Sequence, residues 1–279
     1  MSSSAPITLS PEVRPLGNGL SALPKHCRLK GGGDSDFRKQ LVTLGCLIGC
    51  HVEDGDYHQD TILTGPDTLQ ESLCQLQLSE ETRRMVVRLS IDPNTRYVAI
   101  RHLLALVIFS NLDTHSVGSL SLLPPALKEL FKSLPKPSRE SQDSLVEPAL
   151  VVWNRLTAFL MHDNPQSGDP LPLLPSVESQ VKALVTLLQD FLIHFARTDD
   201  DDSPDTQQTR LEGAITACVR FGYEIFSHPC DWKFTLSQEE RGVLVFPGLE
   251  KHRSDMGELF DSPKVVVPPK VVMVDLMED

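Results

Sequence analysis

The sequence lacks any long apolar run. Its longest strongly apolar stretch, Leu103 to Phe109, has seven residues, whereas a helix needs ~20 to span a bilayer. The first six residues, Met-Ser-Ser-Ser-Ala-Pro, also lack the basic and apolar regions of a secretory signal. We therefore expect an intracellular protein, in the cytoplasm or the nucleus, that does not act on a membrane.

The sequence is also short of positive charge and of clustered cysteine. It has 26 Lys and Arg residues against 38 Asp and Glu, a formal net charge of −12. Because unspecific nucleic-acid binding depends on cations that displace phosphate counterions, direct nucleic-acid binding is not expected. The six cysteines are spread from position 27 to position 230, which is too sparse for the disulfide framework of a small secreted domain.

What the sequence does contain is a tail followed by helical patterns. Residues 1–38 are dominated by Ser, Pro and Gly, and we expect them to form a disordered N-terminal tail. Residues 39–279 are expected to form a single helical domain, whose first segment, FRKQLVTLGCLIGC, fits either a helix or a buried strand. Further helices are expected at residues 67–77, 80–90, 96–112, 124–134, 145–163, 175–198 and 207–227.

Three of these helices have informative patterns. Residues 96–112 are apolar nearly all round, which predicts a buried central helix. Residues 145–163 have Leu150, Trp153, Leu156 and Leu160 at helical spacing. In residues 175–198 we expect Ser176 to be the N-cap of a helix whose apolar stripe is Val177, Val181, Leu184, Leu188, Phe191 and Phe195. Three heptads is short for a coiled coil, so this pattern favours an amphipathic helix in a bundle.

After Pro229 the pattern becomes short and β-branched. The segments WKFTL, GVLVF and KVVVPPKVVMV predict two or three strands within residues 231–275. Pro268 and Pro269 would confine the last strand to a sheet edge or to an extended arm. The sequence thus predicts a mainly α fold, with a bundle-like helical body and a small C-terminal β element.

The strongest candidate for a metal site is the segment CLIGCHVEDGDYH. On a helix, Cys46 and Cys50 would share a face, and His51 and His58 could complete four ligands. A second cysteine group, which zinc sites usually have, is missing. Both cysteines also lie in an apolar run, where free cysteine behaves as a small buried residue. Core packing is therefore favoured, and we expect no metal and no other cofactor.

The segment FSHPCDWKF, residues 226–234, raises the question of catalysis. His228 and Cys230 would point the same way on an extended chain and could form a nucleophile pair. The two partners of such a pair normally come from distant segments, and Pro229 between them favours a rigid corner. A structural junction is the favoured interpretation, and no catalytic residue is assigned.

The region from Leu211 to Val274 resembles the C-terminal part of a set of uncharacterised filamentous-fungal proteins. In that set a helix ends in a Phe-Ser-x-Pro corner, and an aromatic–Phe strand and a VVFPAL-like strand follow. The matching residues are Phe226, Ser227, Pro229, Trp232, Phe234, Val245, Phe246 and Pro247. The resemblance covers under a quarter of the chain and implies no activity.

Together these features predict a non-catalytic helical protein that acts through protein–protein interaction, as a regulatory or accessory factor. Its amphipathic helices and acidic loops indicate a protein partner or a homo-oligomer. One alternative is a metal- or thiol-dependent enzyme that uses Cys46, Cys50 and His51, or Cys230. Another is a transcriptional regulator that acts indirectly, since the sequence has no DNA-binding segment.

Overall fold

A computed structural model describes most of the chain after the first 28 residues. The described residues are 29, 31–54, 57, 64–113, 118–133, 146–167, 169, 171–196, 204–236, 242–254 and 258–274. Their helices are α1 (Asp34–Asp54), α2 (Pro66–Ser72), the short 3-10 helix η4 (Cys74–Leu76), α3 (Glu80–Ile91), α4 (Arg96–Ser110), α5 (Pro125–Ser133), α6 (Val146–Met161), α7 (Pro175–Leu192) and α8 (Pro204–Ser227). Their strands are β1 (Asp231–Thr235), β2 (Gly242–Phe246), β3 (Gly248–Arg253), β4 (Leu259–Val267) and β5 (Lys270–Met273).

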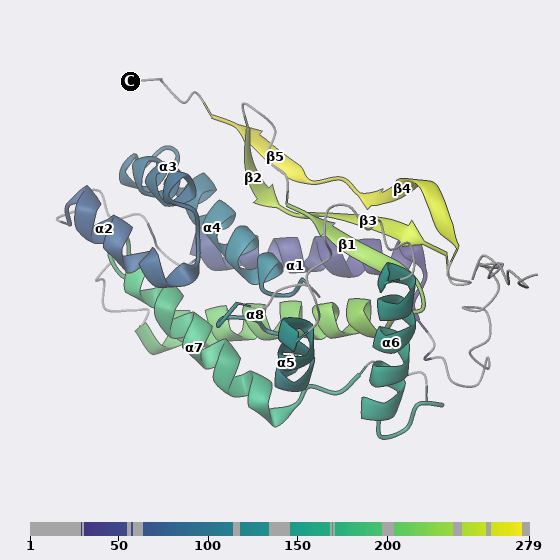
Figure 1. Ribbon diagram of the computed structural model, residues 1–279. Helices are drawn as coiled ribbons and strands as arrows, with labels where there is room; N and C mark the ends of the chain where they lie inside the picture. Colours follow the sequence, from purple (N-terminus) through teal and green to yellow (C-terminus); the bar gives the residue numbers. More distant parts are fainter. Residues whose placement is uncertain are drawn as a thin grey trace, which may run out of the picture.

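The strands, which we call the β layer, lie on one side of the helical body (Figure 1). They form an antiparallel three-stranded sheet in the order β1-β3-β4 and an antiparallel pair of β2 with β5. The prediction of a mainly α fold with a small C-terminal β element is confirmed. Among the described helices, none is both long and apolar enough to cross a membrane.

The prediction of two or three strands is too low for two reasons. The segment GLEKHR forms β3, although its charged residues gave no strand signal. It becomes a strand because β1 and β4 hydrogen-bond to it from both sides. The Val-rich end of the chain is split at Pro268 and Pro269, which cannot donate to a ladder, so that β4 and β5 join different sheets.

Helix α4 lies at the centre of the molecule, as its all-round apolar pattern predicts. Most of its side chains are buried, and it packs against α1, α3, α8 and β2. Nδ1–H of His102 on α4 donates a hydrogen bond to the carbonyl of Leu244 across 2.7 Å, which joins the helix to β2. The central helix thereby connects the helical body to the β layer.

The first segment of the domain is helix α1, and it begins earlier than the sequence indicates. The tail was expected to extend to residue 38, whereas α1 starts at Asp34. The carboxylate of Asp36 accepts a hydrogen bond from the N–H of Gly33 across 3.0 Å, half of a capping box. Asp34 pairs with Lys251 of β3 at 3.1 Å and with Lys264 of β4 at 2.6 Å. These long-range ion pairs extend the ordered domain beyond the boundary that composition indicates.

The apolar stripe predicted for residues 175–198 is confirmed in its burial, because all six of its residues are buried, although α7 ends at Leu192 and Phe195 lies in the turn that follows. The N-cap prediction is wrong. The cap is Leu174, and Ser176 lies inside the first turn, because Pro175 occupies the first helical position. In α6 the expected face is only partly correct. Leu160 is 81% exposed, whereas Arg155 and Ala158 are buried on the side that packs against α8.

Candidate functional site

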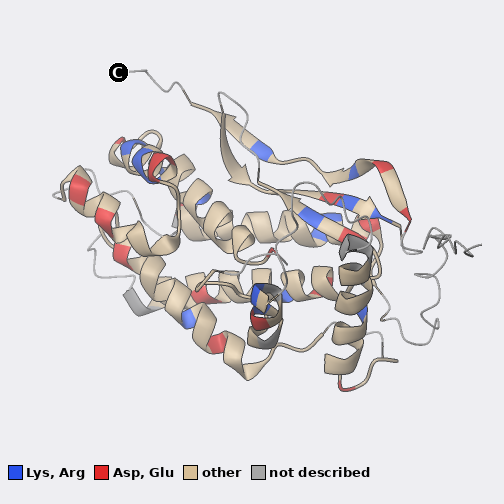
Figure 2. Ribbon diagram, in the orientation of Figure 1, with Lys and Arg blue, Asp and Glu red and all other residues tan. Residues whose placement is uncertain are grey.

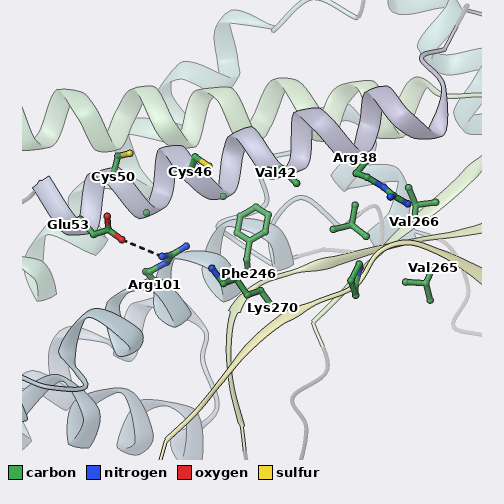
Figure 3. Close-up of a pocket in the computed structure, with 14 residues that line it drawn as sticks. Arg38, Val42, Cys46, Cys50, Glu53, Arg101, Phe246, Val265, Val266 and Lys270 are labelled. Carbon is green, nitrogen blue, oxygen red and sulfur yellow. Dashed lines mark ion pairs between the residues drawn. The ribbon is translucent and has the colours of Figure 1, made fainter.

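A groove of about 640 Å³ lies between α1 and the β layer, and we call it the α1–β groove. One face of α1 forms one wall, with residues at helical spacing: Val42, Gly45, Cys46, Gly49, Cys50 and Glu53. The β layer forms the facing wall, mainly through Phe246, Val265, Val266 and Lys270 (Figure 3). Arg38 and Arg101 complete the lining.

Two glycines on α1 set the shape of this groove. A Cβ atom at Gly45 would lie 3.4 Å from the ring of Phe246, and one at Gly49 would lie 3.3 Å from Nη2 of Arg101. The phenyl ring and the guanidinium therefore lie against the helix where it has no side chains (Figure 3). Because Gly45 and Gly49 lack side chains, the ring of Phe246 forms the floor of the groove and the guanidinium of Arg101 lies beside it.

Arg101 is the most enclosed charge in the groove. Its side chain is 12% exposed, and Nη1 lies 3.7 Å from Oε1 of Glu53, whose side chain is 63% exposed. Nε of Arg101 has no hydrogen-bond partner in the described part of the chain. Arg38 and Lys270 also line the groove, and neither forms an ion pair within the described residues. The groove thus has three cations and one carboxylate in a chain of net charge −12.

Sequence reasoning missed the cationic residues of the groove. A signal for Arg101 was present, because it is a charged residue within the apolar run of residues 96–112. Nothing in the sequence places Phe246 or Lys270 beside α1, because a long-range contact brings them there.

The structure separates the residues of the candidate metal site. Cys46 and Cys50 are exposed on the groove face of α1, contrary to the expectation of core packing. His51 is buried, and its Nε2 forms a 2.9 Å hydrogen bond with the hydroxyl of Tyr57. Burial, with a smaller effect of Arg210, lowers the pKa of His51 to about 4. His58 lies outside the described residues, among which no group of three or more His, Cys, Asp or Glu could hold a metal ion.

The His228–Trp232 segment lies where α8 meets β1. Nδ1 of His228 accepts hydrogen bonds from the backbone N–H of Cys230 and from the indole N–H of Trp232, both at 2.9 Å. The ring centroid of Phe37 on α1 lies 4.9 Å from that of Trp232 and 5.0 Å from that of His228. The guanidinium of Arg155 donates to the carbonyl of Pro229.

These contacts make the segment a rigid junction between α8, α1 and the β layer. The basic nitrogen of His228 is occupied by two N–H donors, so it does not receive the proton of the Cys230 thiol in this structure. Cys230 itself is 4% exposed. The geometry favours the structural interpretation of FSHPCDWKF over the nucleophile pair.

No family model, curated protein or solved structure matches this chain. The resemblance to uncharacterised filamentous-fungal proteins therefore stays a prediction. Its matching residues include Phe226, Ser227, Pro229 and Trp232 in the junction. They also include Phe246, which forms the floor of the α1–β groove.

Proposed function

We propose that this protein is a non-catalytic regulatory or accessory factor that acts by binding a protein partner through strand β4. The observation that carries the proposal is the position of β4. It has nine residues, it lies at the edge of the three-stranded sheet, and most of its side chains are exposed. An edge strand offers unpaired N–H and C=O groups on which a strand from another chain can be added.

Exposed apolar side chains on the β layer support the proposal. Leu259 and Val265 on β4 are 63% and 52% exposed, and Met273 on β5 is 68% exposed. Pro263, Asp261 and Lys264 interrupt the strand with groups that natural proteins use to prevent indiscriminate pairing. Such an edge favours a selective partner over general aggregation.

The charge of the β layer also suits a macromolecular contact. The described residues of the β layer and of the segments that connect its strands include five basic ones, Lys233, Lys251, Arg253, Lys264 and Lys270, and four acidic ones, Asp231, Glu250, Glu258 and Asp261 (Figure 2). The layer is thus nearly neutral in a chain of net charge −12. Electrostatic repulsion of an acidic partner or of a second copy is therefore smaller here than the net charge of the chain would indicate.

A matched pair of variants tests this surface. Leu259→Glu adds a charge on β4, and Leu160→Glu adds the same charge at an 81% exposed position on α6. Size-exclusion chromatography with light scattering first shows whether the chain is a monomer. A protein with a photo-reactive residue at position 265 is then used to cross-link the partner. Each cross-linking reaction contains an excess of one competitor, which is the wild-type, Leu259→Glu or Leu160→Glu protein.

We expect the wild-type and Leu160→Glu proteins to compete for the partner and the Leu259→Glu protein to fail. If the wild-type chain is a dimer, Leu259→Glu should dissociate it and Leu160→Glu should not. If the chain is a strict monomer and all three competitors act equally, β4 is not the interaction surface.

A metal- or thiol-dependent enzyme is the second candidate function. The observation that favours it is the exposure of Cys46 and Cys50 on one wall of the groove. Elemental analysis of the purified protein and thiol-reactivity profiling test it. The absence of a bound metal, together with thiols of ordinary reactivity, would exclude this candidate.

A further inference from the structure

We propose that the α1–β groove binds an amphiphilic monocarboxylate, a small molecule with one carboxylate and a linear apolar body. This goes beyond the protein partner proposed for β4 and does not depend on it. The volume of the groove, about 640 Å³, lies within the range of roughly 300–1,000 Å³ that is usual for small-molecule sites. The chemistry of the lining identifies the class of ligand.

Arg101 is the anchor for the carboxylate. A second arginine on the same helix, Arg96, provides the comparison: it is buried, and it donates to the backbone carbonyls of Ser90, Tyr57 and Ile91. Arg101 is 12% exposed, and among the residues that the structure describes its one interaction is the 3.7 Å ion pair with Glu53. A guanidinium has five N–H donors in a planar fork that matches a carboxylate. The donors of Arg101 are therefore available to an acceptor that enters with the ligand.

The charges around Arg101 favour an anion. Lys270 and Arg38 add positive charge to the groove, so an anion is attracted and a cation is repelled. Glu53, beside Arg101, offsets part of that charge. Coulomb's law alone does not separate a monoanion from a dianion, because attraction and repulsion both scale with the ligand charge. The single planar fork of Arg101 is what matches one planar carboxylate.

The apolar body of the ligand would lie along α1. Val42 on the helix and Val265 on β4 are 54% and 52% exposed, and they are apolar surfaces that a ligand would cover. Phe246 lies between them and the anchor, held by a T-shaped contact with Phe109 at a centroid distance of 5.3 Å. From Arg38 to Glu53 the helix extends about 22 Å, which makes the groove long enough for a linear chain.

Calorimetry with octanoate, nonanoate and decanoate, each below its micellar concentration, tests the proposal on the full chain. Burial of each further methylene should lower the dissociation constant about fourfold. Decanol should bind at least tenfold more weakly than decanoate, and decylammonium should show no binding. If affinity does not depend on chain length, or if decanol binds as well as decanoate, the proposal is overturned.

Variants on α1 and α4 test the place of binding. Val42→Glu puts a negative charge in the groove and should reduce decanoate affinity at least tenfold, whereas Val42→Gln should reduce it less. Leu47→Glu is the matched control, because Leu47 is on the same helix, is 43% exposed and does not line the groove. Arg101→Gln should abolish the preference for decanoate over decanol, whereas Arg84→Gln on α3 should not. Equal effects of Val42→Glu and Leu47→Glu would place binding elsewhere.

Protection of the cysteines gives a readout that needs no variant. Decanoate should slow maleimide labelling of Cys46 and Cys50, which line the groove, but not of Cys74, which is exposed beside α2. Decyl phosphate and hexaglutamate serve as competing probes. If decyl phosphate binds more tightly than decanoate, the site prefers a phosphate head group to a carboxylate. If hexaglutamate protects the groove cysteines and binds as tightly as decanoate, the groove is a peptide site. Either result overturns the proposal.

Discussion

The indole N–H of Trp232 donates a hydrogen bond to Nδ1 of His228 across 2.9 Å. The N–H of Cys230 donates to the same nitrogen, and Nε2 of the ring lies 3.1 Å from the carbonyl of Gly32. Because Nδ1 accepts from two donors and a carbonyl can only accept, neutral imidazole with its proton on Nε2 is the one state that satisfies all three contacts. The junction therefore depends on an uncharged His228.

The pH dependence of stability follows from this arrangement. Burial lowers the pKa of His228 from 6.5 to about 4, with Lys251 and Arg155 acting in the same direction and the Gly32 carbonyl and Asp34 opposing. Since the folded-state pKa is the lower one, the stabilising contribution is complete above pH 6.5 and is lost as the pH falls through about 4. The loss attributable to this residue is roughly 3 kcal/mol.

Urea unfolding between pH 7.5 and pH 4 measures this loss. His228→Asn should be less stable than wild type at pH 7.5 and should show a shallower fall in stability on acidification. His51 and His102, whose pKa values burial also lowers, contribute to the remaining slope. An unchanged slope in His228→Asn would show that the imidazole is not held neutral.

Two buried tyrosines should respond oppositely to loss of the hydroxyl. The hydroxyl of Tyr223 is buried and has no hydrogen-bond partner within the described residues, so Tyr223→Phe should leave stability unchanged or raise it by up to about 1 kcal/mol. The hydroxyl of Tyr57 bonds to Nε2 of His51, so Tyr57→Phe should cost about 1–2 kcal/mol. Thermal unfolding of the two variants side by side measures the difference, and equal costs would contradict it.

Two glycines should likewise respond oppositely to a methyl group. At Gly248 a Cβ atom would lie 2.9 Å from the carbonyl oxygen of Val267 and from the ring of Pro269, so Gly248→Ala should destabilise the fold by about 1–3 kcal/mol. At Gly213, inside α8, nothing lies within 4 Å, so Gly213→Ala should stabilise it by about 0.5–1 kcal/mol. Denaturant midpoints report both effects, and a stabilising Gly248→Ala would refute the close contact of β3 with the Pro268–Pro269 turn.

Alkylation of the folded protein should divide the described cysteines into two groups. Cys46, Cys50 and Cys74 are exposed and should react with iodoacetamide within minutes, whereas Cys218 and Cys230 are buried. Burial also raises the pKa of Cys218 to about 12, which leaves almost no thiolate. Peptide mapping of the alkylated protein, before and after unfolding, shows the order in which the cysteines react. Labelling of Cys230 as fast as Cys46 would reopen the case for a reactive thiol at the junction.

Local patterns in the sequence predicted the helices after α1, because each pattern has its physical cause within a few residues. For α1 the pattern left a helix and a buried strand open. The apolar period of α7 and the all-round apolar character of α4 both correspond to buried helices. The proline pair at 268 and 269 predicted a last strand confined to an edge or an extended arm, and β4 lies at the edge of its sheet. The break between β4 and β5 was not predicted. Where two local signals compete, as with Ser176 beside Pro175, the sequence alone did not decide the end of the helix.

Only the tertiary structure decided the start of α1, the strand β3 and the composition of the groove. Asp34 joins the ordered domain because it meets Lys251 and Lys264, more than 200 residues later in the chain. The charged segment of β3 becomes a strand through its neighbours on both sides, and Phe246 meets Gly45 through packing between distant segments. Such contacts depend on how the chain folds back on itself, and no local propensity encodes the meeting of Arg101, Lys270 and Phe246 beside one face of α1.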